Sequence, residues 1–437
     1  MKRLLIEEAK KGIGRSVKVA GFIQTIRDQG SIKFLILRDI SGIIQAVVLK
    51  DKVEAIKTAE TLSLESVVEI EGLVKEEKQA PGGVEIAVET LTVLSAAKPE
   101  LPIPILEKAS NEADIEKRLN WRWLDLRRPD KALVFKVWTL MEEAFRDYWL
   151  KNNYLEIHSP KLMATPSESG AELFEVQYFE RKAYLAQSPQ FYKQMAMAAG
   201  LEKVFEVGPV FRAEPSFTTR HATEFTGYDA EISFIESHED VMAEEEKILR
   251  SAFEKIKEKF GEEIKKYYDR EVVVPELPFP RLTMKEAKET LAKIGVPSEK
   301  EGDFNPEEER KLSEYIRETK NHEFVFVTEY PVEVRPFYHM RLESNPRVTK
   351  SFDLLYNGVE IATGAEREHR YEVLLSQAEE KGLSLKPLEF YLNFFKYGCP
   401  PHGGFGMGPS RILMKLFDVA SVREAMFLYR GVKRLEP

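Results

Sequence analysis

Residues 1 to about 105 alternate short β-branched runs with polar turns, which restricts this part of the chain to a small β-structure. Five such runs span residues 17–28, 32–39, 43–49, 66–74 and 84–94. A helical stretch over residues 51–62 separates the third run from the fourth. Five strands with one helix in that place are typical of an OB-fold, a partly open barrel that binds oligonucleotides. Another small β-barrel is the alternative that this pattern leaves open.

The rest of the chain mixes helices and strands without regular alternation. Apolar side chains at helical spacing predict a helix over residues 131–151, and helical structure is also expected over 238–264, 284–320 and 371–381. Residues 323–364 are rich in strand signals. This arrangement predicts an α+β fold rather than a doubly wound one. The expected division is a barrel domain over 1–105, a hinge or linker over 106–130 and a larger domain over 131–437.

The expected hinge ends in a basic, aromatic stretch with two competing interpretations. In one, a helix packs Trp121, Trp123 and Leu124 between the domains while its arginines stay solvated. In the other, the stretch is a hinge that touches RNA phosphates, and both can hold.

Composition narrows the class of protein. The net charge of −9 argues against non-specific binding to nucleic acid, although 64 Lys and Arg residues can still build a local basic surface. No apolar run approaches the roughly 20 residues that span a bilayer, and no signal peptide is visible, so we expect a cytoplasmic protein without a membrane partner. A single cysteine excludes an internal disulfide and a Cys-based zinc cluster. A metal ion would therefore be a hard cation held by oxygen ligands.

Two segments carry residue types that suit a nucleotide, although no Walker or dinucleotide glycine motif is present. The first, residues 204–235, predicts a hairpin that carries Arg212, Arg220 and His221 with Phe225 at its base. Guanidinium groups suit phosphate oxygens and an aromatic face suits a purine. In the second, residues 403–417, a glycine-rich turn leads into Arg411. A surface hairpin with solvated charges and a tight structural turn are the plain alternatives.

A further segment, residues 351–370, suits a magnesium ion. Its predicted strand carries Asp353 and Glu360 and continues into Thr363. Carboxylates beside a hydroxyl suit Mg²⁺, which takes few protein ligands and several phosphate oxygens. Solvated acids on a strand are the alternative.

Residues 152–174, 204–235 and 403–417 resemble, in this order, motifs one, two and three of the class II aminoacyl-tRNA synthetases. In detail the chain is similar over essentially its whole length to the aspartyl-tRNA synthetases. Only about 115 residues separate the segments around Arg212 and Glu360, which is typical of the compact archaeal or eukaryotic-like type. The resemblance implies an OB-fold anticodon-binding domain and a catalytic domain with an antiparallel β-sheet flanked by helices. It also implies a homodimer, with Pro160 and residues 131–151 near the interface.

The resemblance also implies an ATP site with Mg²⁺, in which Arg212 and Arg411 are the catalytic residues. Glu360 and Thr363 are the implied metal ligands, and Asp353 is an implied helper outside that ligand pair. The implied ATP-binding residues are Arg212, Ala213, Glu214, Arg220, His221, Ala222, Phe225, Glu360, Gly408, Pro409, Ser410 and Arg411. The chain departs from the family at Ser410, where an acidic residue is more frequent, and at Thr363, where Ser is common.

Aspartate specificity is expected to depend on Lys193 and Arg367, which by resemblance hold the side-chain carboxylate of the substrate. A neutral amide would leave these buried cations without a charge partner, and the related asparaginyl enzymes typically lack the lysine. The implied aspartate-binding residues are Glu168, Ser188, Gln190, Lys193, Arg212, Asp229, Thr363 and Arg367. A family departure at Ala365 leaves the details of its loop open.

In the barrel, Arg27, Phe34 and Gln45 match the spacing of anticodon-reading residues, with Phe34 as a plain core residue the alternative. Gln24 and Pro81 occupy the positions that distinguish strict from relaxed enzymes. Pro81 favours the relaxed type, which also loads aspartate onto tRNA(Asn) and needs an amidotransferase partner.

The resulting expectation is ATP-dependent activation of L-aspartate and its transfer to the 3′-end of tRNA(Asp) and, in the relaxed type, of tRNA(Asn). Two alternatives remain open. One is an asparaginyl-tRNA synthetase, and the other is a non-catalytic paralogue or one that adenylates a metabolite.

Overall fold

The computed structural model describes residues 1–105, 112–164, 172–298, 300 and 302–437. The chain divides into two compact units, Met1–Lys117 and Arg118–Pro437. Residues 118–130, which were expected to form part of a hinge, therefore belong to the second unit. The predicted substrate contact Glu168 lies outside the described residues.

The first unit is a closed five-stranded barrel with strand order β1-β2-β3-β5-β4, which confirms the predicted OB-fold. Its strands are β1 (Ser16–Asp28), β2 (Ile32–Arg38), β3 (Ile43–Leu49), β4 (Val67–Glu76) and β5 (Val84–Ser95). Its helices are α1 (Ile6–Ala9), α2 (Val53–Glu60) and the 3-10 turn η1 (Pro81–Gly83). Buried and partly exposed residues alternate along β4, as expected for a strand with one face in the core. The β3–β5 pair is parallel and closes the barrel.

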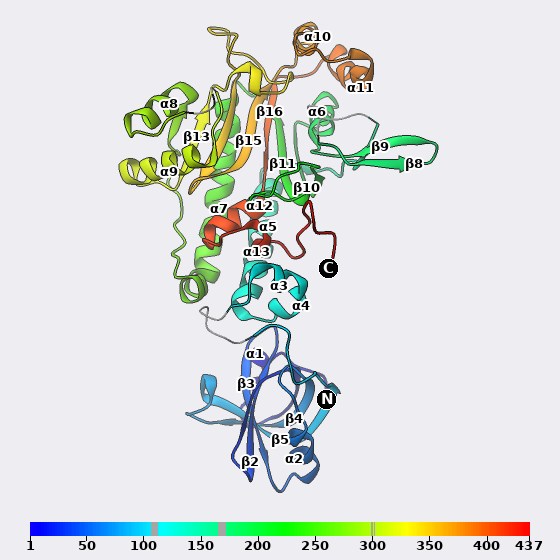
Figure 1. Ribbon diagram of the computed structural model, residues 1–437, viewed down its shortest axis with the longest axis vertical. Coiled ribbons are helices and arrows are strands. Elements are labelled where there is room, and N and C mark those ends of the chain that lie inside the picture. Colours follow the sequence, from blue (N-terminus) through cyan, green and yellow to red (C-terminus); the bar gives the residue numbers. More distant parts are fainter. Residues whose placement is uncertain (106–111, 165–171, 299, 301) are drawn as a thin grey trace. The chain divides into compact units, whose positions relative to one another are not determined.

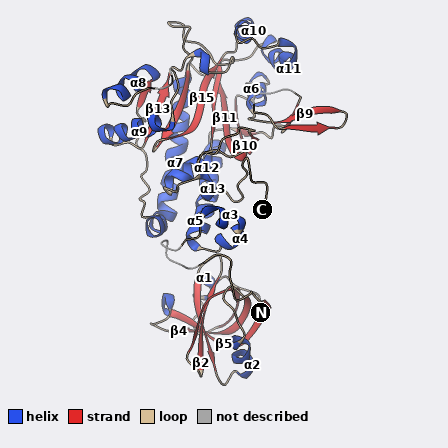
Figure 2. Cartoon of the chain, in the orientation of Figure 1, coloured by secondary structure: helices blue, strands red, loops and turns tan. Residues whose placement is uncertain are grey.

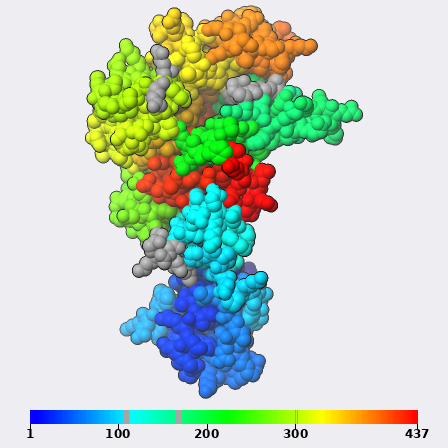
Figure 3. Space-filling view, in the orientation of Figure 1, coloured from blue at the N-terminus to red at the C-terminus, as the bar shows by residue number. Residues whose placement is uncertain are grey.

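The second unit is built on an eight-stranded sheet with order β12-β13-β14-β15-β16-β11-β10-β6 (Figures 1 and 2). These strands are β6 (Leu155–Glu156), β10 (Lys203–Phe211), β11 (Glu224–Ser233), β12 (Arg281–Thr283), β13 (Phe324–Thr328), β14 (Ser351–Tyr356), β15 (Val359–Arg367) and β16 (His402–Met407). The unit also has a small sheet of β7 (Leu162–Met163), β9 (Arg181–Leu185) and β8 (Glu175–Tyr178). Its β8–β9 hairpin extends from the body of the unit (Figure 1) and forms a projecting lobe in the space-filling view (Figure 3).

The sheet is antiparallel in its centre, as expected, but both edges are parallel. The pairs β12–β13 and β6–β10 run parallel, so the sheet as a whole is mixed. A parallel pair requires a long crossover connection, and both edges have one. The chain between β12 and β13 contains two helices, and the chain between β6 and β10 contains the small sheet and another helix.

Helices cover one face of this sheet and bury the main hydrophobic core. The core joins Tyr228, Ala230 and Phe405 of the sheet to apolar side chains of α5, α7 and α12. The helices of this unit are α3 (Ile115–Asn120), which spans the unit boundary, α4 (Arg122–Asp125), α5 (Pro129–Lys151), α6 (Gln190–Ala198), α7 (His238–Tyr268), α8 (Met284–Lys293), α9 (Pro306–Lys320), η3 (Val332–Val334), α10 (Tyr371–Glu380), α11 (Leu385–Lys396), α12 (Pro409–Leu416) and α13 (Val422–Ala425). Among the described residues, no helix is both long and apolar enough to cross a bilayer.

The helical pattern over 284–320 belongs to two helices rather than one. Gly295 adopts φ +78° directly after α8, and Pro297 follows it, so the helix cannot continue. Asn305 then caps α9, because its side chain accepts hydrogen bonds from the backbone of Glu307 and Glu308.

The arginines of α3 and α4 are not solvated, which corrects one of the two interpretations of this stretch. Arg122 is 1% exposed. It donates to Asp125 Oδ2 at 2.6 Å and to the carbonyl oxygen of Met426 at 2.8 Å. Arg118 pairs with Glu424 at 3.1 Å. Trp121 and Trp123 keep 37% and 52% exposure, whereas Leu124 is buried.

Candidate active site

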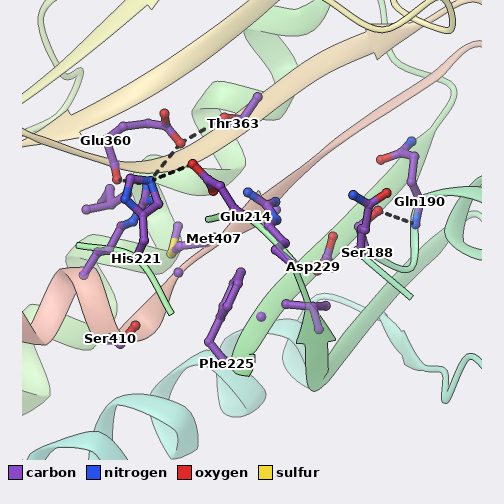
Figure 4. A pocket seen from close by; sticks show the side chains of 18 of the residues that line it. Ser188, Gln190, Glu214, His221, Phe225, Asp229, Glu360, Thr363, Met407 and Ser410 are labelled. Carbon is purple, nitrogen blue, oxygen red and sulfur yellow. Dashed lines mark hydrogen bonds and ion pairs between the residues drawn. The ribbon is translucent and has the colours of Figure 1, made fainter. Parts of the chain in front are cut away.

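A cavity of about 240 Å³ opens on the sheet face opposite the main core (Figure 4). Side chains from β11, β15, α6, α12 and the β10–β11 loop line this cavity together. The predicted residues that line it are Ser188, Gln190, Lys193, Arg212, Glu214, Arg220, His221, Ala222, Phe225, Asp229, Glu360, Thr363, Arg367, Gly408, Ser410 and Arg411. Segments that are up to about 220 residues apart in the sequence therefore meet at one site.

Strand alternation on β11 explains how one strand serves both ends of the cavity. Tyr228 and Ala230 point into the main core. The side chains between and beside them face the other way, so Phe225, Asp229 and Glu231 share the cavity face. At roughly 3.3 Å per residue, Phe225 and Glu231 lie about 20 Å apart along the strand.

Glycines of β16 form the floor between β11 and β15. Gly406 is paired with both Asp229 and Thr363, and Gly404 is paired with Glu231. A Cβ on Gly404 would lie 2.1 Å from the carbonyl oxygen of Ala230 and 2.2 Å from Glu231 Oε2. Only glycine at this position leaves room for the Glu231 carboxylate.

A bulge in β15 brings Glu360 and Thr363 to the same cavity. The two residues are an odd number of positions apart and would face opposite sides of a regular strand. The β14–β15 register shifts between Leu354 and Leu355, so that Leu355 pairs with Glu360 and Leu354 with Ala362. Both Glu360 and Thr363 then line the cavity, with Thr363 Oγ1 donating to Glu360 Oε1 at 3.4 Å (Figure 4).

Three arginines and a histidine surround one end of the cavity, which we call the cationic end (Arg212, Arg220, His221 and Arg411). The Arg212 guanidinium lies over the Phe225 ring at 5.5 Å and makes no hydrogen bond or ion pair within the described part of the chain. Arg411 sits in the first turn of α12 and donates to the carbonyl oxygen of Glu360 at 2.8 Å and, more weakly, to that of Arg220 at 3.3 Å. These cations leave donors for an anionic ligand.

The histidine of this end is neutral near pH 7. Burial, together with the neighbouring Arg411 and Arg220, lowers the pKa of His221 to about 4. The hydroxyls of Ser216 (3.1 Å) and Thr218 lie at its Nδ1. A neutral imidazole beside arginines adds polar contacts without adding charge.

Glu360 is kept ionised by nearby arginines. Burial alone would raise the pKa of Glu360, but Arg411, Arg335 and Arg212 hold it below its ordinary value. Its neighbour Asp353 is engaged elsewhere, because Arg335 pairs with Asp353 Oδ2 at 2.7 Å. The donor set of a carboxylate and a hydroxyl fits Mg²⁺, which needs few protein ligands when phosphate oxygens are present.

The opposite end of the cavity buries two cations among acids, and we call it the charge-balanced end (Lys193, Asp229, Glu231 and Arg367). Lys193 Nζ donates to Asp229 Oδ1 and to the carbonyl oxygen of Phe405, both at 2.9 Å. It also lies 3.4 Å from Glu231 Oε2. Lys193 is only 2% exposed, so a solvated helix lysine is excluded.

Arg367 is held on the other side of the same carboxylate. Its Nε donates to Glu231 Oε1 at 2.9 Å, and one terminal nitrogen donates to the carbonyl oxygen of Gly404 at 2.9 Å. The other terminal nitrogen lies 2.9 Å from His339 Nε2. Burial, and to a smaller extent the charge of Arg367, keeps the pKa of His339 well below its ordinary value. The imidazole is therefore neutral, and its Nε2 accepts a hydrogen bond from Arg367.

The formal charges of this end cancel before any ligand enters. Lys193 and Arg367 are matched by Asp229 and Glu231. Burial would raise the pKa of Glu231, but Arg367 and Lys193 hold it below its ordinary value. The sequence indicated a cationic pocket, and the structure instead shows cations already paired and oriented, with a ligand required to share them.

A second layer of polar groups supports α6 beneath the charge-balanced end. Gln190 Nε2 donates to Gln194 Oε1 at 2.9 Å, and Tyr391 donates to the same oxygen at 2.9 Å. Gln194 Nε2 lies 3.0 Å from His402 Nε2. Ser188 accepts from the backbone of Gln190 at 3.3 Å. These contacts fix the helix that carries Lys193.

Some predicted site residues lie elsewhere. Ala213 and Pro409 belong to the surrounding loop and helix but do not line the cavity. In the first unit, Arg27 donates to Gln45 Oε1 at 3.2 Å and stacks on Phe34 at 5.8 Å. Gln45 in turn donates to Glu85 Oε2 at 2.9 Å. The three predicted anticodon residues are therefore neighbours. Gln24 lies on β1 and Pro81 begins η1.

The charged and polar partners that the sequence interpretation missed include Glu231, Arg335, His339 and Glu309. Glu231 carried a usable signal, because it follows Asp229 by two residues on a strand. Arg335 and His339 lie in an irregular stretch without periodicity, and Glu309 is one of three consecutive acids in a first helical turn.

Comparison with known proteins agrees with this architecture. Residues 114–430 match the model of class II tRNA synthetases (D, K and N), and residues 17–94 match an OB-fold nucleic acid binding domain. The chain is 45% identical to an Aspartate--tRNA(Asp/Asn) ligase of Aeropyrum pernix, with 99% of this chain and 98% of the relative covered. It is 44% identical to an Aspartate--tRNA(Asp) ligase of Pyrococcus abyssi, with 97% of each chain covered.

Solved structures give the same result at the level of the fold. The asparaginyl-tRNA synthetase of Pyrococcus horikoshii complexed with asparaginyl-adenylate superposes with a TM-score of 0.93 at 35% identity, covering 100% of both chains. A putative aspartyl-tRNA synthetase from Leishmania major gives a TM-score of 0.89 at 29% identity, covering 100% of this chain and 95% of the other. On the full-length identity and the matching family model, the chain belongs to the class II tRNA synthetases of the D, K and N group.

Proposed function

We propose that the protein activates L-aspartate with ATP and transfers it to the 3′-end of tRNA(Asp). The observation that carries this proposal is the buried pair of Lys193 and Arg367, which share Glu231 at one end of a cavity whose other end is lined by Arg212, Arg220 and Arg411. One end suits a carboxylate side chain and the other suits a triphosphate. The names of the full-length relatives support the same activity.

In this proposal, ATP lies along the cavity with its base against Phe225. Arg212 then reaches the α-phosphate and the substrate α-carboxylate, while Arg220, His221 and Arg411 contact the outer phosphates. Glu360 and Thr363 would hold Mg²⁺, which when bound supplies charge neutralisation for the phosphate oxygens. The remaining ATP contacts follow the family pattern and stay predictions, as does the part of Glu168.

The reaction proceeds in two steps. The aspartate α-carboxylate attacks the α-phosphorus in line, an anhydride bond forms, and pyrophosphate leaves. Arg212 and Arg411 stabilise the charge that develops on the phosphate oxygens. The terminal 3′-hydroxyl of tRNA then attacks the carbonyl carbon of the anhydride, and AMP leaves. Orientation by the fixed cations accounts for most of this rate enhancement, because the described cavity offers no obvious general base for the hydroxyl.

The direct test is charging of tRNA transcripts with labelled aspartate. We expect purified protein to charge the tRNA(Asp) transcript in the presence of ATP and Mg²⁺. A protein that turns over ATP but charges no transcript would support the paralogue that adenylates a metabolite, and a protein inactive in both assays would support a non-catalytic one.

An asparaginyl enzyme is the second candidate, because solved asparaginyl-tRNA synthetases superpose closely on this chain. Against it stands the placement of Lys193 and Arg367, which both line the cavity. A carboxylate ligand can share their charges with Asp229 and Glu231, whereas an amide offers them only a dipole. The relatives of highest printed identity bear aspartate names.

We further propose that the protein also charges tRNA(Asn), and Pro81 at the start of η1 is the feature that favours it. Relatives named for one tRNA and for both tRNAs match the chain almost equally well, at 44% and 45% identity. A kinetic comparison of both transcripts decides the matter. Charging of tRNA(Asp) alone would contradict this part of the proposal and the need for an amidotransferase.

We also expect a cytoplasmic homodimer. An apolar groove formed by Phe135, Trp138, Met426, Phe427 and Leu428 lies beside α5, the helix that the family pattern assigns to the interface. Light scattering on the purified protein should give twice the chain mass of 50.3 kDa. A monomer at micromolar concentration would contradict this expectation.

A further inference from the structure

Glu309 reaches the cationic end from a part of the fold that contributes no cavity-lining residue. It lies in the first turn of α9 and is 5% exposed. Its Oε2 pairs closely with a terminal nitrogen of Arg220, and the same oxygen accepts from the backbone nitrogen of Glu360 at 3.4 Å. One carboxylate oxygen thus connects the β10–β11 loop to β15.

The first turn of α9 is itself firmly held. The Asn305 side chain accepts hydrogen bonds from the backbone of Glu307 and Glu308, both at 2.9 Å. Glu308 Oε1 pairs with Lys288 of α8 at 2.7 Å. Glu309 is therefore presented from a capped turn in which the Asn305 and Glu308 side chains are held.

Arg220 by contrast belongs to a loop that is held mainly through its backbone, where Ser421 donates to the carbonyl oxygen of Thr219 at 3.0 Å and Arg411 to that of Arg220 at 3.3 Å. Its neighbours Phe217, Thr218 and Thr219 are exposed, and Phe217 keeps 63% exposure. The Arg220 side chain lines the cavity, and its buried Nε has no hydrogen-bond partner among the described residues. A guanidinium carries five N–H donors in a fixed plane, so one edge can stay with Glu309 while the others serve a ligand.

We propose that Glu309 is a positioning residue that fixes the Arg220 guanidinium at the cationic end before ATP arrives. This inference rests on the proposed function, in which Arg220 contacts the outer phosphates. A long arginine side chain on an exposed loop would otherwise lose much of its rotamer freedom on binding ATP. Because Glu309 orders the Arg220 side chain before ATP binds, this entropy is not lost on binding. Glu309 should therefore strengthen binding of the outer phosphates only.

The test compares Glu309→Ala with the matched control Glu307→Ala. Glu307 lies in the same helical turn, but it is exposed and pairs with Arg310 at 3.0 Å. In aspartate-dependent ATP–pyrophosphate exchange we expect Glu309→Ala to raise the KM for ATP about ten-fold, with the KM for aspartate unchanged. Glu307→Ala should match the wild type. Glu309→Gln keeps an acceptor oxygen for Arg220 and should recover most of the affinity.

Two further measurements separate positioning from a general structural role. By calorimetric titration, Glu309→Ala should weaken binding of ATP but leave AMP, which lacks the outer phosphates, unchanged. In an Arg220→Ala background, the further change Glu309→Ala should have no added effect on ATP, because Glu309 acts through that arginine. Unchanged or tighter ATP binding by Glu309→Ala, equal weakening of AMP, or a full additional loss in the Arg220→Ala background would each overturn the proposal. Failure of the proposed function looks different, since the wild type would then show no aspartate-dependent exchange.

Discussion

The two ends of the cavity hold their cations differently: one end buries them in ion pairs, and the other leaves them accessible. At the charge-balanced end, Lys193 and Arg367 are 2% and 3% exposed and share the carboxylate of Glu231. At the cationic end, Arg212 is exposed to the cavity and Arg220 lies on an exposed loop. Under the proposed function, the amino acid would be selected by a rigid pocket whose cations are already paired. The triphosphate would be bound by side chains that still have free donors.

The largest effect is expected when a cation is removed from the charge-balanced end. Lys193→Met leaves Asp229 and Glu231 with one cation fewer in a buried site. Truncating one partner of a buried charge pair costs about 2–5 kcal/mol, so we expect aspartate-dependent exchange to fall about a thousand-fold. The matched control is Lys182→Met, which removes a 67% exposed lysine side chain paired with Glu175. A Lys193→Met enzyme within a few-fold of the wild type would show that this lysine does not hold the substrate.

A cation removed from the other end should have a smaller effect, and on a different substrate. Loss of one preorganised donor to a developing charge costs about a hundred-fold or somewhat more in rate. We therefore expect Arg411→Ala to lower kcat/KM for ATP by about a hundred-fold, with calorimetric aspartate affinity unchanged. If the affinity for aspartate fell as well, the two ends would be coupled. That result would contradict separate binding of the amino acid and ATP at the two ends.

Rigidity itself can be tested at the floor of the charge-balanced end. A Cβ at Gly404 would lie 2.2 Å from Glu231 Oε2, and the neighbouring backbone leaves it no alternative space. Overpacking of this kind costs about 1–3 kcal/mol, so Gly404→Ala should lower the melting temperature and weaken aspartate more than ATP. The matched control is Gly261→Ala on α7, where an added Cβ would have only a flexible lysine side chain nearby. Unchanged aspartate affinity in Gly404→Ala would indicate an adaptable pocket.

The smallest expected effect concerns the protonation of His221. Its folded-state pKa of about 4 lies below the ordinary value of 6.5. The unfolded chain therefore binds a proton that the folded chain does not, and this histidine favours unfolding increasingly as pH falls from about 6.5 towards 4. Because Arg411 contributes to the shift after burial, Arg411→Ala should raise the pKa of His221, as measured by NMR titration of the imidazole. A His221 resonance that titrates near 6.5 in the wild type would contradict the arrangement at the cationic end.

The sequence was informative wherever a residue type is tied to a regular element. Alternation predicted the strands of the barrel, and helical spacing predicted α5, because both patterns are set by local backbone geometry. The family motifs then located most of the cavity-lining residues. Local signals were weaker for Glu360 and Thr363, whose common face depends on a bulge that no spacing rule indicates.

The partners of the predicted residues were harder to anticipate, because they depend on contacts between distant segments. Arg367 and Glu231 are 136 residues apart, and Arg220 and Glu309 are 89 residues apart. Nothing near His339 or Glu309 in the chain distinguishes them from an ordinary buried histidine or an acidic first turn. Charge balance within the pocket is likewise a property of the assembled sheet.

Selection of a carboxylate over an amide by the charge-balanced end is the central claim, and amino-acid-dependent ATP–pyrophosphate exchange tests it most directly. With purified protein, aspartate should support rapid exchange, and asparagine at the same concentration should support about a thousand-fold less. Exchange with asparagine that equals or exceeds exchange with aspartate would contradict the account, whatever the fold.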